Sequence, residues 1–371
     1  MNGQWMGSYS GSNNGILVVD LDDMGSHFEG YAYAYDDNSS LPSTYVQIKT
    51  TGKKASANLK VVVFPIDPRT GEAGIWENLV AIYPNATFPK NADVKISLKK
   101  NILKVEWKTD IGTSGTAKLP RTKAHTPTEY EPLSNITTWE KFKTYVNKLE
   151  HRRYVFRGQR EAKRLRTTFH RTGRADLYRF ISSDIKVLHR HLSLRTSHIF
   201  NLKEPDENGS FFNLVQHHGY PTPLLDWTYS PFVGAFFAYR KAMSSISDSN
   251  NPSKKVRIFL FDHKQWCLDV TPQVPKLVGK PHFSFMEFIA IDNERHIPQQ
   301  SISSLTNVDD IESYVQKMEK PEKKYLQIID LPLKERPRVM KDLSSMGITA
   351  GSLFPGLDGT CEELKERFFS V

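Results

Sequence analysis

The first 120 residues carry the feature that most limits the fold, a series of short strand-like runs. Gly, Asn, Asp and Pro turn signals separate these runs at intervals of roughly 8–15 residues, which predicts an all-β sandwich or a small barrel. Within the series, ISLKKNILKVEW predicts a hairpin that turns at Lys100 and Asn101. The seven runs are GILVVDLDD, HFEGYAYAYDD, STYVQIKT, NLKVVVFPID, DVKISLKK, ILKVEWKTD and TSGTAKL.

No cluster of acids, bases or nucleophiles accompanies the aromatic residues of this β-rich region in the sequence. Large aromatic side chains at alternating positions are more often part of a core than of a ligand pocket. We therefore interpret them as core residues and keep a ligand pocket as the alternative. They are Trp5, Tyr9, Tyr31, Tyr33, Tyr35, Trp76 and Trp107.

The composition indicates a globular chain with more than one domain. Its 371 residues exceed the usual size of one domain, and 39% hydrophobic with 25% charged residues is ordinary for a water-soluble protein. The longest apolar runs are too short to cross a bilayer, and the opening MNGQWMGSYSGSNNG lacks the order of a secretory signal. Cys267 and Cys361 offer neither a disulfide framework nor a metal-binding spacing. We expect a cytoplasmic protein with reduced thiols, no membrane partner and no resident metal.

A proline-rich stretch divides the chain. LPRTKAHTPTEYEPL has three prolines and few aliphatic residues, so we expect a β-rich accessory domain at 1–120, a linker at 121–134 and a second domain at 135–371. The second domain begins with TTWEKFKTYVNKLE, in which Thr137 and Glu140 are expected to form a capping box. Further helical runs alternate with the strand-like runs RYVFRG, RIFLFD and YLQIID, which predicts an α+β domain with an exposed loop at residues 244–255.

The positive charge of the chain is concentrated in one segment. Residues 141–203 contain 17 Lys or Arg and 4 Asp or Glu, whereas residues 1–125 contain 14 and 12. Such a segment attracts phosphates, either of a dinucleotide or of a nucleic acid. The alternative is a basic surface that is balanced by acids elsewhere in the fold.

RYVFRG ends a predicted strand with an arginine and a glycine. The planar donors of Arg157 match phosphate oxygens, and Gly158 allows a ligand to approach the main chain closely. The structural alternative is an ion pair between Arg157 and an acid such as Asp226.

QHHGYPTPLLDWT is the densest polar phrase. Adjacent histidines with one nearby aspartate are weak evidence for a metal, and the chain has no nucleophile elbow. The structural alternative is that Asp226 caps a turn and Trp227 lies in the core. In the following SPFVGAFFAY, Ser230 is expected to cap a helix whose N-terminus could receive an anionic ligand close to Thr228.

Together these phrases resemble the FRG domain family, which is named for its Phe-Arg-Gly motif. Five phrases occur in the family's order over residues 135–371, and no family is recognised for the β-rich region. They are FRGQ at 156–159, VQHHGYPTPLLDWT at 215–228, SPFVGAFFAY at 230–239, NERHIPQQS at 293–301 and GITAGSLFPGLDG at 347–359.

The layout of that family is similar to that of ADP-ribosyltransferases, which split NAD at the nicotinamide ribose. The resemblance implies an NAD-using enzyme of the toxin or anti-phage defence kind with NAD as its substrate. It assigns the phosphates or ribose to Arg157, the nicotinamide amide to the main chain at Gly158, and the ribose to Thr228 and Ser230. Gln216 is the remaining residue that we assign to NAD binding.

The chain departs from that superfamily where a glutamate is expected, because RHIPQQSI offers only Gln299 and Gln300. We assign the glutamate's place to Gln300, with Asp226 or Glu294 as the acid that replaces the missing charge. His217 or His218 would act as the base toward the acceptor.

The acceptor is either a nucleic acid or a protein that the basic segment attracts. A second hypothesis is a non-catalytic protein that binds nucleic acid or nucleotides. A third is a metal-dependent hydrolase that uses His217, His218 and Asp226.

Overall fold

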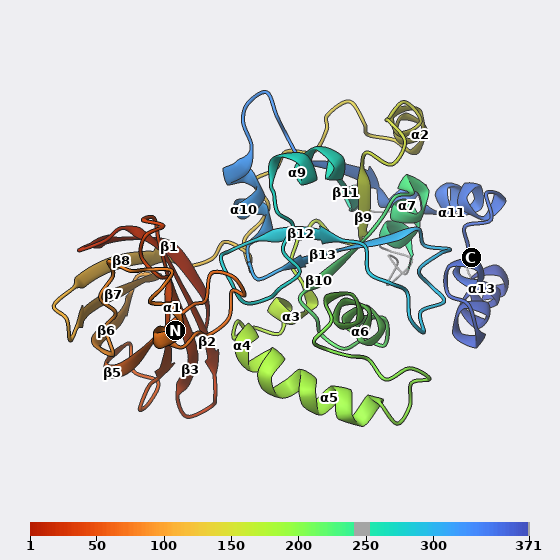
Figure 1. The fold of residues 1–371 in the computed structure, drawn as a ribbon. Coiled ribbons are helices and arrows are strands. Elements are labelled where there is room, and N and C mark those ends of the chain that lie inside the picture. Colours follow the sequence, from red (N-terminus) through yellow and green to blue (C-terminus); the bar gives the residue numbers. More distant parts are fainter. Residues whose placement is uncertain (241–252, 370–371) are drawn as a thin grey trace.

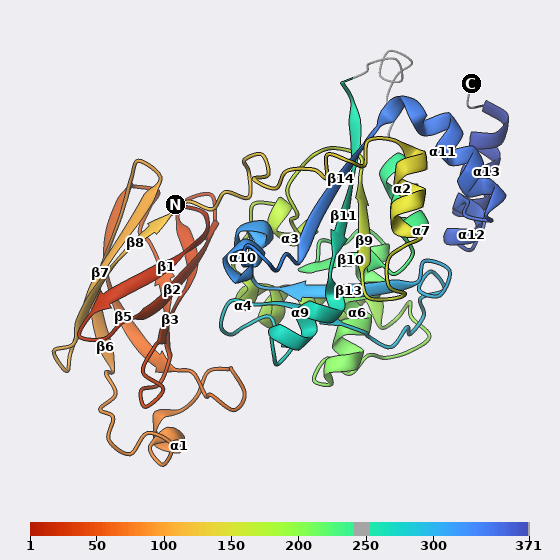
Figure 2. The same cartoon turned by 90° about the horizontal axis from the view of Figure 1, so that it is seen from above.

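The computed structural model describes residues 1–240 and 253–369, and they form two domains that lie side by side (Figures 1 and 2). The first is a closed barrel of eight antiparallel strands, and the second combines a six-stranded sheet with helices. The architecture is therefore α+β, with a barrel rather than a sandwich at the N-terminus. No helix in the described part of the chain is both long and apolar enough to cross a membrane.

The barrel is an up-and-down meander. Each strand pairs with the next, and β1 also pairs with β8, which closes the sheet. The predicted hairpin is confirmed, since Lys100 and Asn101 have φ of +48° and +62°, as a tight two-residue turn requires. The strands are β1 (Gly3–Gly11), β2 (Gly15–Asp23), β3 (Phe28–Asp36), β4 (Thr44–Lys49), β5 (Ser56–Pro65), β6 (Asn91–Lys99), β7 (Ile102–Thr109) and β8 (Ser114–Pro120), and the short α1 (Trp76–Leu79) lies between β5 and β6.

The second domain is built on a sheet of order β12-β13-β10-β9-β11-β14, in which all neighbouring strands are antiparallel. The strands are β9 (Val155–Gln159), β10 (Leu224–Thr228), β11 (Lys255–Phe261), β12 (Phe283–Met286), β13 (Ser301–Thr306) and β14 (Leu326–Pro332). The helices are α2 (Trp139–Val146), α3 (Thr168–Arg171), α4 (Leu177–Arg179), α5 (Ile185–Leu192), α6 (Pro205–His217), α7 (Pro231–Tyr239), α9 (His263–Asp269), α10 (Ile311–Met318), α11 (Arg336–Ser345), α12 (Ala350–Leu353) and α13 (Leu357–Phe369). A π-helical turn (Phe180–Asp184) joins α4 to α5, and a 3-10 turn (Leu333–Glu335) precedes α11.

Separate hydrophobic cores cover the two faces of this sheet. On one face, α2, α7, α11 and α12 pack on β9, β11 and β14, with Trp139 and Phe236 fully buried. On the other, α9, α10 and β12 surround Trp227 and Phe261. Trp227 is thus a core residue, as the structural alternative predicted.

Some local predictions need correction. The N-cap of α2 is Thr138, whose side chain accepts a hydrogen bond from the Lys141 amide, and not Thr137. The backbone is still extended at Thr138, so the helix begins one residue later than the capping-box pattern predicts. The predicted exposed loop at 244–255 falls mainly on residues 241–252, which lie outside the described residues.

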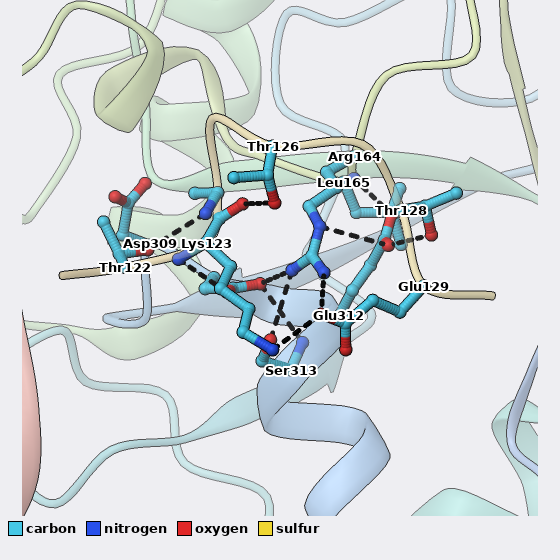
Figure 3. Close-up of polar contacts among 12 residues, drawn as sticks. Thr122, Lys123, Thr126, Thr128, Glu129, Arg164, Leu165, Asp309, Glu312 and Ser313 are labelled. Atoms are coloured by element: carbon cyan, nitrogen blue, oxygen red, sulfur yellow. Dashed lines mark hydrogen bonds and ion pairs between the residues drawn. The ribbon is translucent and has the colours of Figure 1, made fainter. Parts of the chain in front are cut away.

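Polar contacts fasten residues 121–134 to the second domain (Figure 3). Arg164 donates to the carbonyl of Pro127 at 3.1 Å and to Asp310 Oδ1 at 2.7 Å, and its side chain is almost fully buried. The Lys123 amide also donates to Asp310, at 3.1 Å. Glu312 accepts from the hydroxyl of Thr128, so the segment between the domains is held in one path.

A buried carboxylate of the barrel anchors the second domain. Asp22 on β2 accepts from the side chains of Arg174 and Arg179 and, at 2.7 Å, from the amide of Ala175. Its side chain is only 2% exposed, so water screens these charged contacts only weakly. Asp22 therefore fixes the barrel to the segment that leads into α4.

Asp22→Asn should weaken the contact between the domains. The substitution removes the carboxylate that the two guanidinium groups share, so that Arg179 loses its carboxylate partner and Arg174 keeps only Asp184, and breaking a buried charge pair costs about 3 kcal/mol. Asp23→Asn is the matched control, because Asp23 pairs with Lys53 at the surface and such pairs contribute at most about 1 kcal/mol. Urea unfolding of the two variants measures the difference, and equal losses would contradict the role given to Asp22.

Candidate functional site

The site lies where two central strands of the second sheet separate. β9 pairs with β11 along its whole length, but it pairs with β10 only through Phe156 and Thr228. If the second ladder continued, Gly158 would lie opposite Asp226, and no such pair forms between the described strands. Main-chain groups of residues 157–159 that point toward β10 therefore have no ladder partner in that strand.

Arg157 bridges this opening. Its Nη1 donates to the main-chain oxygen of Asp226 at 2.6 Å, whereas its Nε is buried without a hydrogen-bond partner. No ion pair joins this guanidinium to a carboxylate within residues 1–240 and 253–369, so the expected alternative of an Arg157–Asp226 salt bridge is wrong, and the contact goes to the main-chain oxygen of Asp226 instead. Burial lowers the pKa of Arg157 to about 10, partly offset by the charge of Asp226, and the side chain stays cationic at neutral pH.

Gly158 is required by the packing of β9 on α7. A Cβ atom at this position would lie 2.1 Å from the carbonyl oxygen of Gly234 and 2.4 Å from the amide nitrogen of Ala238. These are main-chain atoms that cannot move without shifting the helix. Gly158 is thus needed mainly because α7 packs closely against it, while its main chain also borders the pocket.

A pocket of about 210 Å³ opens at the separated strands. It brings together Arg157, Gly158, His217, Asp226 and Thr228, which the sequence predicted to share one site. The remaining lining residues are Phe156, Trp227, Phe237, Gln299, Ser301 and Phe354.

Asp226 is the acidic residue in this lining. Its Oδ1 accepts from Gln216 Nε2 at 2.5 Å, and Gln216 in turn accepts from the hydroxyl of Thr222. Gln216 thus orients the carboxylate of Asp226 and is absent from the pocket wall. His217 is half-buried, with Nδ1 3.0 Å from Asn293 Oδ1.

The hydroxyls of Thr228 and Ser230 already have protein partners. Thr228 donates to the carbonyl of Gln299 at 2.7 Å and accepts from the amide of Ser230 at 3.0 Å. Ser230 accepts from the amide of Val233 and caps α7, as predicted. Both side chains therefore hold the turn between β10 and α7, and the hydroxyl of Thr228 can accept one further hydrogen bond.

Gln299, and not Gln300, lines the pocket. The buried Gln299 donates through Nε2 to the carbonyl of Leu353 at 2.8 Å, whereas Gln300 is exposed and has a φ of +47°. This left-handed residue turns the chain into β13 and directs its own side chain away from the lining residues. The prediction that Gln300 takes the glutamate's place in the site needs this correction.

His218 and Glu294 also lie outside the pocket. Both are exposed, and His218 is the C-cap residue of α6. Across the residues that the structure describes, no group of three or more His, Cys, Asp or Glu is arranged to hold a metal ion.

A comparison with family models identifies part of the second domain. Residues 152–246 match the FRG domain model. The chain carries an FRG domain. No curated protein and no solved structure matches the chain. The match begins just before β9 and extends past α7, so it contains both strands and the helix that shape the pocket.

Much of the positive charge in this part of the FRG domain is neutralised within the fold. At least seven of the 17 cations in residues 141–203 pair with carboxylates, several of which belong to distant segments such as Asp262, Asp309 and Asp342. The basic segment is therefore a weaker attractor of nucleic acid than its sequence indicates. The paired cations are Lys143, Arg153, Lys163, Arg164, Arg166, Arg174 and Arg179.

Two aromatic walls of the pocket had no site role assigned from the sequence. Phe237 lies on α7, and Phe354 follows α12 in the last quoted FRG phrase, where no role was assigned to it. The guanidinium groups of Arg240 and Arg295 lie 3.8 and 5.4 Å from the centre of the Phe354 ring. These contacts fix the ring at the pocket, but no spacing in the sequence indicates them.

Gly158→Ala should destabilise the FRG domain by about 1–3 kcal/mol, because an added methyl in a closely packed site forces the backbone to shift. Gly52→Ala is the control, since a Cβ there meets no atom within 4 Å. Thermal unfolding followed by circular dichroism compares the two. A Gly158→Ala protein as stable as the control variant would show that β9 and α7 are not in such close contact.

Proposed function

We propose that the FRG domain is an ADP-ribosyltransferase-like enzyme that takes NAD as its substrate. The observation that carries the proposal is the half-buried guanidinium of Arg157 at the opening between β9 and β10, which pairs with no carboxylate of the described residues and whose buried Nε has no hydrogen-bond partner. A buried cation without a carboxylate is costly, and an anionic group such as a pyrophosphate offsets that cost with charge-assisted hydrogen bonds.

The dimensions of the pocket suit one end of NAD. A cavity of about 150 Å³ can hold a benzene ring, so about 210 Å³ admits the nicotinamide ring but not the whole dinucleotide. Phe237 and Phe354 supply aromatic surface for the ring, and the unpaired main-chain groups beside Gly158 can bond its amide. The phosphates and adenosine would then lie outside, with Arg157 at the boundary.

In the proposed reaction the glycosidic bond between ribose C1′ and the nicotinamide nitrogen breaks, and its electron pair leaves with nicotinamide. Positive charge develops on the ribose as the bond lengthens. A nucleophilic atom of the acceptor then forms the new bond to C1′ and loses its proton to a base. His217, which lines the pocket, is our candidate for that base.

Asp226 is our candidate for the negative charge that stabilises the developing cation. It is an acid in the pocket wall and is oriented by Gln216, whereas β13 and the residue before it carry no carboxylate from Gln300 to Thr306. Gln299 can hydrogen-bond a ribose hydroxyl but contributes no charge. Electrostatic groups of this kind are worth about 3–4 kcal/mol, so the choice of acid decides the rate.

The setting and acceptor rest on the family resemblance and on charge. We place the activity in toxin or anti-phage defence, with a nucleic acid or a protein as acceptor. The cations of residues 141–203 that are not neutralised in the fold would bring an anionic acceptor toward the domain.

Arg157→Ala should reduce nicotinamide release by roughly 100-fold or more, because the loss of one charge-assisted contact in a desolvated site costs about 3 kcal/mol. Arg195→Ala, an exposed change in the same basic segment, should leave the rate unchanged. The assay uses NAD labelled in the nicotinamide ring, with fractions of cell extract as acceptor. If no fraction supports release, or if both variants behave alike, the proposal is wrong.

The two adjacent glutamines provide a test of geometry. Gln299→Asn withdraws the amide from Leu353 and from the pocket and should slow nicotinamide release about tenfold, the value of one hydrogen bond of about 1.4 kcal/mol. Gln300→Asn shortens an exposed side chain, and asparagine tolerates its positive φ, so the rate should stay within about twofold. A larger effect at Gln300 than at Gln299 would restore the original assignment.

The absent glutamate favours a second candidate, a domain that binds a nucleotide without turning it over. This candidate predicts that NAD binds at Arg157 and that no nicotinamide is released. Isothermal titration with NAD alongside the release assay separates the two functions. Binding to random oligonucleotides that falls steeply with salt would instead support the nucleic-acid alternative.

A further inference from the structure

The barrel encloses a cavity of about 160 Å³ that has no part in the proposed NAD site. Its wall is formed by inward-facing residues of β1 to β7, and its mouth by the connections at one end together with Ser114 at the start of β8; these connections include Ser12, Leu41, Phe88 and Ile111. Toward the other end Trp5 is 1% exposed and its Nε1 donates to the carbonyl of Met1 at 2.7 Å. The barrel is therefore a cup that is closed at one end.

Small residues on β3 create this space. Ala32 and Ala34 line the cavity, whereas the tyrosines that alternate with them point out of the barrel. Tyr31 lies against Tyr178 of the FRG domain, with ring centres 4.6 Å apart. The large side chains of this strand thus serve the contact between domains, and the interior is left unfilled.

The cavity wall is mostly apolar, with neutral hydroxyl and amide side chains and one acid, Asp36. Tyr9 and Trp107 meet edge to face at this wall, with 5.4 Å between ring centres, so they belong to the barrel core as expected and also line a pocket, which was the alternative. Asp36 accepts from the Tyr9 hydroxyl at 3.1 Å and from the Asn38 amide at 2.9 Å. Burial and Asp36 raise the pKa of Tyr9, so its hydroxyl remains a donor.

The charged groups of the cavity wall determine which ligands it favours. A carboxylate offers about four acceptor positions, and the two contacts of Asp36 leave about two of them for a ligand. None of the described residues that line the cavity is Lys, Arg or His, so nothing in the wall would neutralise an anionic ligand. A carboxylate or phosphate ligand would be repelled, and a donor or cation would be favoured.

We propose that the barrel binds a small molecule with one aromatic ring and an amino or other N–H donor group, with the ring against Trp107 and the donor at Asp36. The size follows from the volume, since an apolar cavity of about 150 Å³ binds benzene. This inference is independent of the NAD site and concerns a second ligand for the chain.

Benzylamine and benzoate test the proposal, because they share a ring and differ in charge. Isothermal titration of the full chain should show benzylamine binding about fivefold more tightly than benzoate, the effect of a partly exposed ion pair worth about 1 kcal/mol. Asp36→Asn should remove this preference while weak binding of the ring persists. Asp226→Asn should leave benzylamine binding unchanged, which separates the barrel from the FRG pocket.

Substitutions in the barrel test the location of the binding site. Ala34→Leu fills the cavity and should abolish binding, whereas Ala55→Leu adds the same side chain at an exposed position of the barrel and should not. If Ala34→Leu does not fold, Thr44→Phe obstructs the same cavity from a half-buried position and should also abolish binding. The proposal is overturned if neither probe binds, if benzoate binds as well as benzylamine, or if the cavity-filling variants bind normally.

Discussion

The separation of β9 from β10 is the constraint on which the FRG domain depends. It places the guanidinium of Arg157 in a gap where a ladder of main-chain hydrogen bonds would otherwise run, and a single bond to the carbonyl of Asp226 spans that gap. An unsatisfied buried donor costs about 1–3 kcal/mol, so this arrangement is less stable than a continuous sheet. The rest of the domain must hold the two strands apart.

Helix α7 and the neighbouring strands supply that support. β9 is fixed along one edge by five consecutive pairs with β11, and on one face of the sheet by the backbone of α7, which packs against Gly158. β10 is fixed by five pairs with β13. Each of the two strands is therefore held by the partner on its outer side, and the gap between them does not close.

The sequence predicted most elements whose signals are local and missed those that depend on distant partners. Strands β2 to β8 and the hairpin at Lys100 were found because alternation and turn residues lie within one segment. β1 contains Gly3, Gly7 and Gly11 and has little strand propensity, and it forms because it alone can pair with both β2 and β8 and close the barrel. The site shows the same contrast between local and distant signals, since Arg157 and Asp226 lie in sequence motifs that resemble the FRG family. Which of Gln299 and Gln300 lines the pocket depends on the left-handed backbone at Gln300, and two adjacent glutamines give no sequence signal for it.

Strand β3 shows how one short sequence can serve two purposes. Its inward face leaves the barrel cavity open, and its outward face packs on the FRG domain near the contacts of Asp22. A ligand that fits the cup without moving β3 has equal affinity for every arrangement of the two domains and changes nothing in the FRG pocket. A ligand that displaces β3 must alter the contact at Tyr31, and by linkage the state of the FRG domain would then alter the ligand's affinity to the same extent. Whether the barrel is only a binding module or also a control element is therefore decided by how far β3 can move while Asp22 stays bound to its two arginines.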